Sequence, residues 1–153
     1  MITKRLGLSI AALAIALLIG IGLITSQTKS HNSASQAVTM GRPFDLNLDQ
    51  TVTVEPSDLN VTLLNIEDSR CPSGVQCPWE GQVTTTLEVR RGDSVIRQID
   101  LTRHVGQREL ATQSIDGYSL ELIEVDPHPQ AERSLEPSDY AATFMLTDVV
   151  SQD

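Results

Sequence analysis

The chain has 153 residues, a formal net charge of −9 at pH 7 and only 3% aromatic residues, a length that suits one domain with accessory segments. All twenty acidic residues lie from Asp45 onward, whereas the stretch from Gly41 onward has eight arginines and no lysine. The resulting formal charge of −12 on this part argues against nucleic acid and against anionic lipid surfaces as partners.

The first predicted element is an apolar helix over residues 6–25, which contain no charged side chain. At about 1.5 Å per residue, this helix is roughly 30 Å long and spans the hydrocarbon of a bilayer. Lys4 and Arg5 precede it, so this flank is expected to stay in the cytoplasm and the rest of the chain outside it. Residues 1–25 are therefore predicted to be a signal anchor or a signal peptide.

These two alternatives give two locations. A cleaved signal peptide has an apolar stretch of about 7 to 15 residues, followed closely by small residues. Here the apolar run is longer, and the small-residue triplet Ser35-Gln36-Ala37 lies well beyond its end. This favours a single-pass protein of the cell membrane with its C-terminal domain outside the cytoplasm. If cleavage occurs, the domain is periplasmic or secreted.

The next segment, residues 26–41, is rich in Ser, Gln, Asn and Thr and poor in large apolar residues. It buries too little to offset its ordering entropy, so a flexible linker is predicted there. From residue 42 to residue 153 an extracytoplasmic β domain is predicted. Apolar residues alternate with polar ones, which is typical of half-buried strands, over residues 44–48, 52–54, 61–66, 83–89, 95–101, 118–125 and 142–149.

The number of such runs predicts the fold class. The chain is expected to be all-β, an antiparallel β-sandwich of about seven strands, Ig-like or alternatively a small barrel. Residues 91–94 are expected to form a hairpin turn. Only residues 104–113 are compatible with a short helix in this domain, and Gly106 weakens that interpretation.

One stretch, DSRCPSGVQCPWEGQ over residues 68–82, holds both cysteines and the single tryptophan. In an exported chain two cysteines predict one disulfide, Cys71–Cys77. Closing a loop of about seven residues stabilises the fold by roughly 2 to 2.5 kcal/mol in the chain-entropy description. Pro72 and Pro78 stiffen the loop further, because each fixes its own φ.

The residues around the loop have structural interpretations. Trp79 is expected to fill one end of the sandwich, its indole N–H bonded to a carbonyl. Asp68 is expected to pair with Arg70 across the loop neck or to cap amides of the turn. If Val75 and Gln76 project into solvent instead, a recognition surface is favoured. The candidate binding tip therefore consists of Asp68, Arg70, Val75, Gln76 and Trp79.

Chemical sites are not recognisable in the sequence. Two cysteines need two further ligands for zinc, and His104 and His128 do not stand at a recognisable metal spacing. His128 is interpreted as a surface histidine in a proline-flanked loop. Neither a redox C-x-x-C pair nor a Gly-x-Ser-x-Gly nucleophile motif is present. No catalytic residue, metal or cofactor is predicted, and the protein is not expected to be an enzyme.

The run DSRCPSGVQCPWEG resembles the signature of a group of small exported bacterial proteins that carry no established activity. Residues 118–140 resemble the latter half of those proteins, and the likeness covers most of residues 42–150. It implies an exported β domain. Pro78 departs from the apolar or β-branched residue expected before the tryptophan, which leaves the start of the next strand undefined.

Two functional hypotheses follow. The first is a membrane-tethered or secreted accessory module that binds an unknown protein or small ligand of the cell envelope, with residues 6–25 in the membrane. The alternative is an inhibitor or ligand sensor that presents the Cys71–Cys77 loop as a rigid recognition loop, because rigidity lowers the ordering cost of binding.

Overall fold

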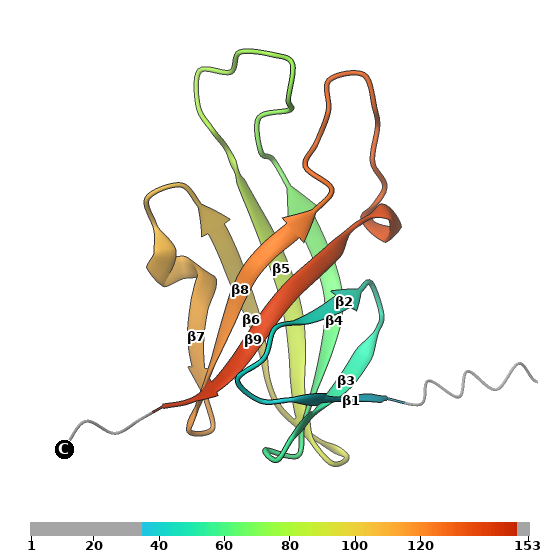
Figure 1. The fold of residues 1–153 in the computed structure, drawn as a ribbon, viewed down its shortest axis with the longest axis vertical. Helices are drawn as coiled ribbons and strands as arrows, with labels where there is room; N and C mark the ends of the chain where they lie inside the picture. Colours follow the sequence, from blue (N-terminus) through green and yellow to red (C-terminus); the bar gives the residue numbers. More distant parts are fainter. Residues whose placement is uncertain (1–34, 150–153) are drawn as a thin grey trace, which may run out of the picture. The chain divides into compact units, whose positions relative to one another are not determined.

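The computed structural model describes residues 35–149, which form two β-sheets and two short 3₁₀ helices, with no α-helix among these residues (Figure 1). The larger sheet has the strand order β1-β3-β4-β5-β6, with bounds Gln36–Thr39, Thr51–Glu55, Leu59–Asp68, Gln82–Arg91 and Ser94–His104. The smaller sheet has the order β2-β9-β8-β7, with bounds Phe44–Asn47, Ala141–Asp148, Tyr118–Asp126 and Thr112–Ile115. The 3₁₀ helices are η1 (Arg108–Ala111) and η2 (Pro137–Asp139).

Alternation along the strands produces the core. In β5 every second side chain is buried, as the period of two predicts, and β4 shows the same alternation from Leu59 to Leu63, after which a bulge makes Ile66 the next buried residue. Buried residues of both sheets form one cluster, in which the rings of Phe44 and Phe144 lie 6.1 Å apart. The largest side chains with almost no exposed surface include Leu46, Leu59, Leu63, Leu87, Leu101, Leu120, Leu122, Phe144 and Leu146. The predicted all-β class with two sheets is confirmed, and the strands do not close into a barrel.

The strand count and the start of the first sheet differ from the expectation. Nine strands lie within residues 35–149, not about seven, and β1 pairs parallel with β3, so the larger sheet is not purely antiparallel. This strand occupies residues 36–39 of the segment expected to be a linker. Val38 packs against the core, and the edge of β3 supplies hydrogen-bond partners, so four residues suffice for a strand here. Of the helix considered over residues 104–113, only η1 forms.

The hairpins divide the domain into two ends (Figure 1). The connections β3–β4, β5–β6 and β7–β8 are turns of two or three residues, and we call this the turn end. At the opposite end β4–β5 is connected by residues 69–81, β6–β7 by residues 105–111 and β8–β9 by residues 127–140. We call it the loop end, and it contains the DSRCPSGVQCPWEGQ stretch.

Within residues 35–149 no helix is both long and apolar enough to cross a bilayer. The segment predicted to be an anchor or signal peptide, residues 1–25, lies outside the described residues, as does the first part of the expected linker.

Candidate functional site

The β4–β5 connection, residues 69–81, forms a projecting disulfide tip. Cys71 and Cys77 are bonded, with their Cα atoms 5.9 Å apart, so the predicted disulfide is confirmed. Below the bond, Ser69 N donates to Gln82 O (2.8 Å) and Cys71 N donates to Glu80 O (2.9 Å). These two bonds continue the β4–β5 pairing into the tip and give it a two-stranded neck.

A glycine is required in that neck. Gly81 has a φ of +72°, in the left-handed region, and a Cβ added to it would overlap the carbonyl oxygen of Ser69. The close approach of the two neck strands therefore depends on the missing side chain at this position.

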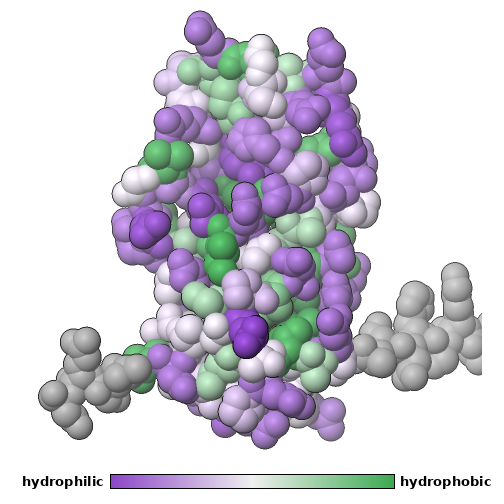
Figure 2. All heavy atoms as spheres, viewed as in Figure 1, coloured by the Kyte–Doolittle hydropathy of each residue, from purple (hydrophilic) through white to green (hydrophobic). Residues whose placement is uncertain are grey.

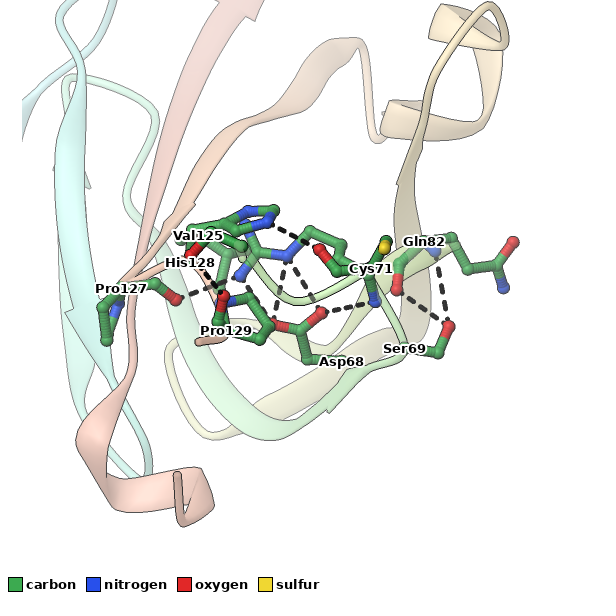
Figure 3. A network of polar contacts seen from close by, with 10 residues as sticks. Asp68, Ser69, Cys71, Gln82, Val125, Pro127, His128 and Pro129 are labelled. Carbon is green, nitrogen blue, oxygen red and sulfur yellow. Dashed lines mark hydrogen bonds and ion pairs between the residues drawn. The ribbon is translucent and has the colours of Figure 1, made fainter. Parts of the chain in front are cut away.

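An ion pair anchors the tip to both sheets. Arg70 Nη2 lies 2.6 Å from Asp68 Oδ2, and the two side chains are only 17% and 2% exposed. The same guanidinium donates from Nη1 to Val125 O (2.8 Å) at the end of β8 and from Nη2 to Pro127 O (3.1 Å) (Figure 3). Asp68 Oδ1 also accepts a hydrogen bond from the Arg70 backbone N–H (3.0 Å). The carboxylate therefore pairs with the guanidinium and also caps a backbone amide of the turn, as expected.

Tyr140, which precedes β9, is buried beside this pair. Burial raises the pKa of its phenol, and the negative charge of Asp68, to which the hydroxyl is hydrogen-bonded, raises it further, while Arg70 opposes both effects. The phenol is therefore held neutral, and its hydroxyl donates to the Asp68 carboxylate, which is already paired with Arg70. The three side chains close the core beneath the tip.

A second set of bonds joins the tip to the β8–β9 connection. His128 Nε2 lies 3.0 Å from Cys71 O, and Ser73 N donates to Pro129 O (2.9 Å). Ala131 N in turn donates to Ser73 O (3.2 Å). Figure 3 shows the His128 ring directed toward the Cys71 carbonyl. The tip is thus braced on one side by a loop more than fifty residues away in sequence.

The five residues predicted for the binding tip separate into two groups. Asp68 and Arg70 lie beneath the tip and hold it, whereas Val75 (49% exposed), Gln76 and Trp79 (73% exposed) face solvent. The expectation that Trp79 fills the end of the sandwich is wrong. Tyr140 and the Arg70–Asp68 pair already close that end, so the indole stays outside.

Sequence reasoning missed the bracing residues. The sequence predicts a surface histidine at His128, and the side chain is exposed, but its ring contacts the Cys71 carbonyl. Ser73 is expected only as a turn residue beside Gly74, and no contact between Ser73 and Pro129 is predicted. The proline-flanked sequence DPHPQ was the one available signal, because it indicates a stiff loop, but nothing in it specifies the tip as its contact.

A cleft of about 540 Å³ lies beside the tip. Its buried apolar lining comes from Val83, Ala111 and Val125. The tip contributes Glu80, the end of β6 and the following loop contribute a cationic wall, and β8 contributes an acidic one. Its polar and charged lining residues are Arg70, Glu80, Arg103, His104, Gln107, Arg108, Glu121, Glu124 and His128. Among the described residues no group of His, Cys, Asp and Glu side chains is arranged to hold a metal ion.

No protein-family model, curated protein or solved structure matches this chain. Function is therefore inferred from the chemistry of the tip and the cleft.

Proposed function

We propose that the chain is an extracytoplasmic β-sandwich, membrane-tethered or secreted, that binds a partner protein of the cell envelope through its disulfide tip. The observation that carries this proposal is the exposed Trp79 on a braced loop. Tryptophan is the residue most enriched among binding hot spots, and its burial removes a large apolar area from water. Covering the exposed indole surface at about 25 cal/mol per Å² contributes on the order of 3 to 4 kcal/mol.

Rigidity supports the same conclusion. The disulfide, the neck bonds and the contacts of Ser73 and His128 restrict the tip before any partner arrives. A loop that is already ordered loses little conformational freedom on binding. A purely structural disulfide does not need a solvent-facing apolar apex, and this apex carries Val75 as well as Trp79.

The tip projects outward, which favours a protein partner over a small molecule, because small ligands are held in concave sites. Elsewhere on the domain hydrophilic residues cover most of the face seen in Figure 2, and apolar residues form only small, separate groups there. An inhibitor that inserts the Cys71–Cys77 loop into the active site of an enzyme is the alternative form of the same recognition.

The test compares the tip with a matched surface position. The full chain and its Trp79→Ala and Val95→Ala variants are immobilised and exposed to envelope extract from the cells that make the protein. Val95 is an exposed apolar residue at the turn end. A protein retained by the wild type and by Val95→Ala should bind Trp79→Ala at least about tenfold more weakly, equivalent to about 1.4 kcal/mol. Equal retention by all three forms contradicts the proposal.

The disulfide gives a second, quantitative expectation. A Cys71→Ser, Cys77→Ser double variant should lose about 2 kcal/mol of unfolding free energy, measured by urea denaturation. Its tryptophan emission maximum should not move, because Trp79 is already exposed in the oxidised form. Partner affinity should fall, since the loosened tip has more freedom to lose on binding. Affinity that is unchanged by reduction would show that the loop's stiffness has no part in recognition.

A further inference from the structure

The cleft beside the disulfide tip contains charged side chains of both signs that are not paired with one another. Arg103 and Arg108 line it, and so do Glu80, Glu121 and Glu124. None of these five takes part in an ion pair within residues 35–149. The contrast is with Arg70, which also lines the cleft but is fully engaged by Asp68 and two carbonyls.

The backbone of β8 adds acceptors to one wall. Strand β7 pairs with β8 only as far as Thr112, which lies opposite Glu121, so residues 122–126 have a strand partner on the β9 side alone. On this open side Val125 O accepts a short bond from Arg70, whereas Leu122 O accepts a long one, 3.5 Å, from Arg103. The hydrogen bond from Arg103 is thus the weaker of the two.

The size and lining of the cleft suit a small molecule. Its volume of about 540 Å³ lies within the range of roughly 300 to 1,000 Å³ found for ligand pockets. Val105, which is 67% exposed, offers the cleft an apolar surface, whereas Val83, Ala111 and Val125 are at most 5% exposed. A ligand with only a negative charge would be repelled by the three glutamates, and a ligand with only a positive charge would be repelled by the two arginines.

We propose that this cleft binds a small zwitterionic ligand, a molecule with an ammonium group, a carboxylate and an apolar part, as in a free amino acid or a short peptide. The ammonium group is held by the carboxylates of Glu121 and Glu124 and by Leu122 O. The carboxylate is held by Arg103 and Arg108, through charge-assisted hydrogen bonds. The apolar part packs against the exposed side chain of Val105.

This site is separate from the surface that contacts the partner protein. Val75, Gln76 and Trp79 do not line the cleft. The inference therefore stands or fails independently of the function proposed for the tip.

Isothermal titration calorimetry of the full chain tests the proposal with two zwitterionic probes, L-leucine and the tripeptide Ala-Leu-Ala. Each has two blocked forms, one N-acetylated and one C-amidated, that lack a single charge. One or both zwitterions should bind, and each blocked form should bind at least about tenfold more weakly, as expected for loss of one charge-assisted contact. Which probe binds better distinguishes a free amino acid from a peptide as the source of the chemistry.

Variants test which charged group of the ligand is held by the acidic wall and which by the cationic wall. Glu121→Gln should weaken the zwitterion at least about tenfold but leave the N-acetylated form unaffected, and Arg103→Gln should show the same pattern with the C-amidated form. Arg97→Gln, an exposed residue of β6 outside the cleft, is the control and should bind normally. Trp79→Ala should also bind the zwitterion normally, which separates this site from the tip. Absence of heat with both probes at millimolar concentration, or equal binding of charged and blocked forms, overturns the proposal.

Discussion

The connections at the two ends of the domain are held differently, because the short turns of the turn end close within themselves, whereas two long loops of the loop end are bonded to one another. At the turn end the chain reverses in two or three residues, and a typical contact is local: Ser57 Oγ donates to Val54 O at 2.6 Å. At the loop end the decisive contacts, from Arg70 to Val125 O and from His128 to Cys71 O, join residues more than fifty positions apart. Short-range contacts complete the strands, whereas long-range contacts fix a surface in place.

This comparison predicts that the largest single effect comes from the base of the tip. Asp68→Ala leaves the Arg70 guanidinium without its carboxylate in a site that is largely shielded from water, and it also removes the acceptor of Tyr140. Breaking a buried pair in this way costs about 3 kcal/mol of unfolding free energy. The control is Glu88→Ala, which breaks the more exposed Arg90 pair and should cost less than about 1 kcal/mol. Urea denaturation measures both, and similar values for the two variants would contradict the difference between the ends.

Two glycines allow the ends to be compared with the same substitution. Both Gly81, in the tip neck, and Gly92, in the β5–β6 turn, have a positive φ, but only at Gly81 would a Cβ overlap backbone atoms. Gly92→Ala should therefore cost about 1 kcal/mol, from the left-handed backbone alone. Gly81→Ala should cost about 2 to 3 kcal/mol, because the Ser69 carbonyl must also move. Equal thermal midpoints for the two variants would mean that the neck strands separate without difficulty.

The smallest expected effect is a pH dependence at the loop end. The pKa of Tyr140 is raised above its ordinary value of 10.0, so the stability that its proton contributes is complete below pH 10 and is lost as the pH rises through the folded-state value. Tyr140→Phe should be about 1 kcal/mol less stable than the wild type near pH 8, because it lacks the hydroxyl hydrogen bond. That difference should narrow above pH 10. Denaturation at several pH values checks it, with Tyr118→Phe as control.

The turn end was the part that the sequence predicted well. Alternation along the strands and the residues 91–94, with their glycine, contain enough local information to place a hairpin. The disulfide was equally predictable, since the two cysteines of the chain allow only one intramolecular pairing. The pairing of Asp68 with Arg70 was also expected, because the two residues are only two positions apart.

The loop end could be predicted only in part, for a physical reason. Whether Trp79 is covered depends on what else fills the end of the core, and that role belongs to Tyr140, which lies 61 positions away. The same holds for His128, whose partner is a backbone carbonyl that no side-chain pattern records. The cleft combines residues of β5, β6, η1 and β8, so its charges became a group only when the two sheets were placed together.

The short parallel strand β1 determines where the chain enters the domain. It runs parallel to β3, with Gln36 opposite Val52, and Val52 pairs with Val61 near the start of β4, so the first described residues lie in the half of the domain nearer the turn end (Figure 1). The last described residue, Val149, donates its N–H to Gly117 O in the β7–β8 turn, so the chain also leaves there.

The entry point and the disulfide tip lie on opposite sides of the domain. From Val61, near the start of β4, to Asp68 at its end is a distance of about 20 Å along the strand. The first described residues therefore lie on the side of the domain away from Trp79. The described chain thus begins and ends on the side of the domain opposite the disulfide tip.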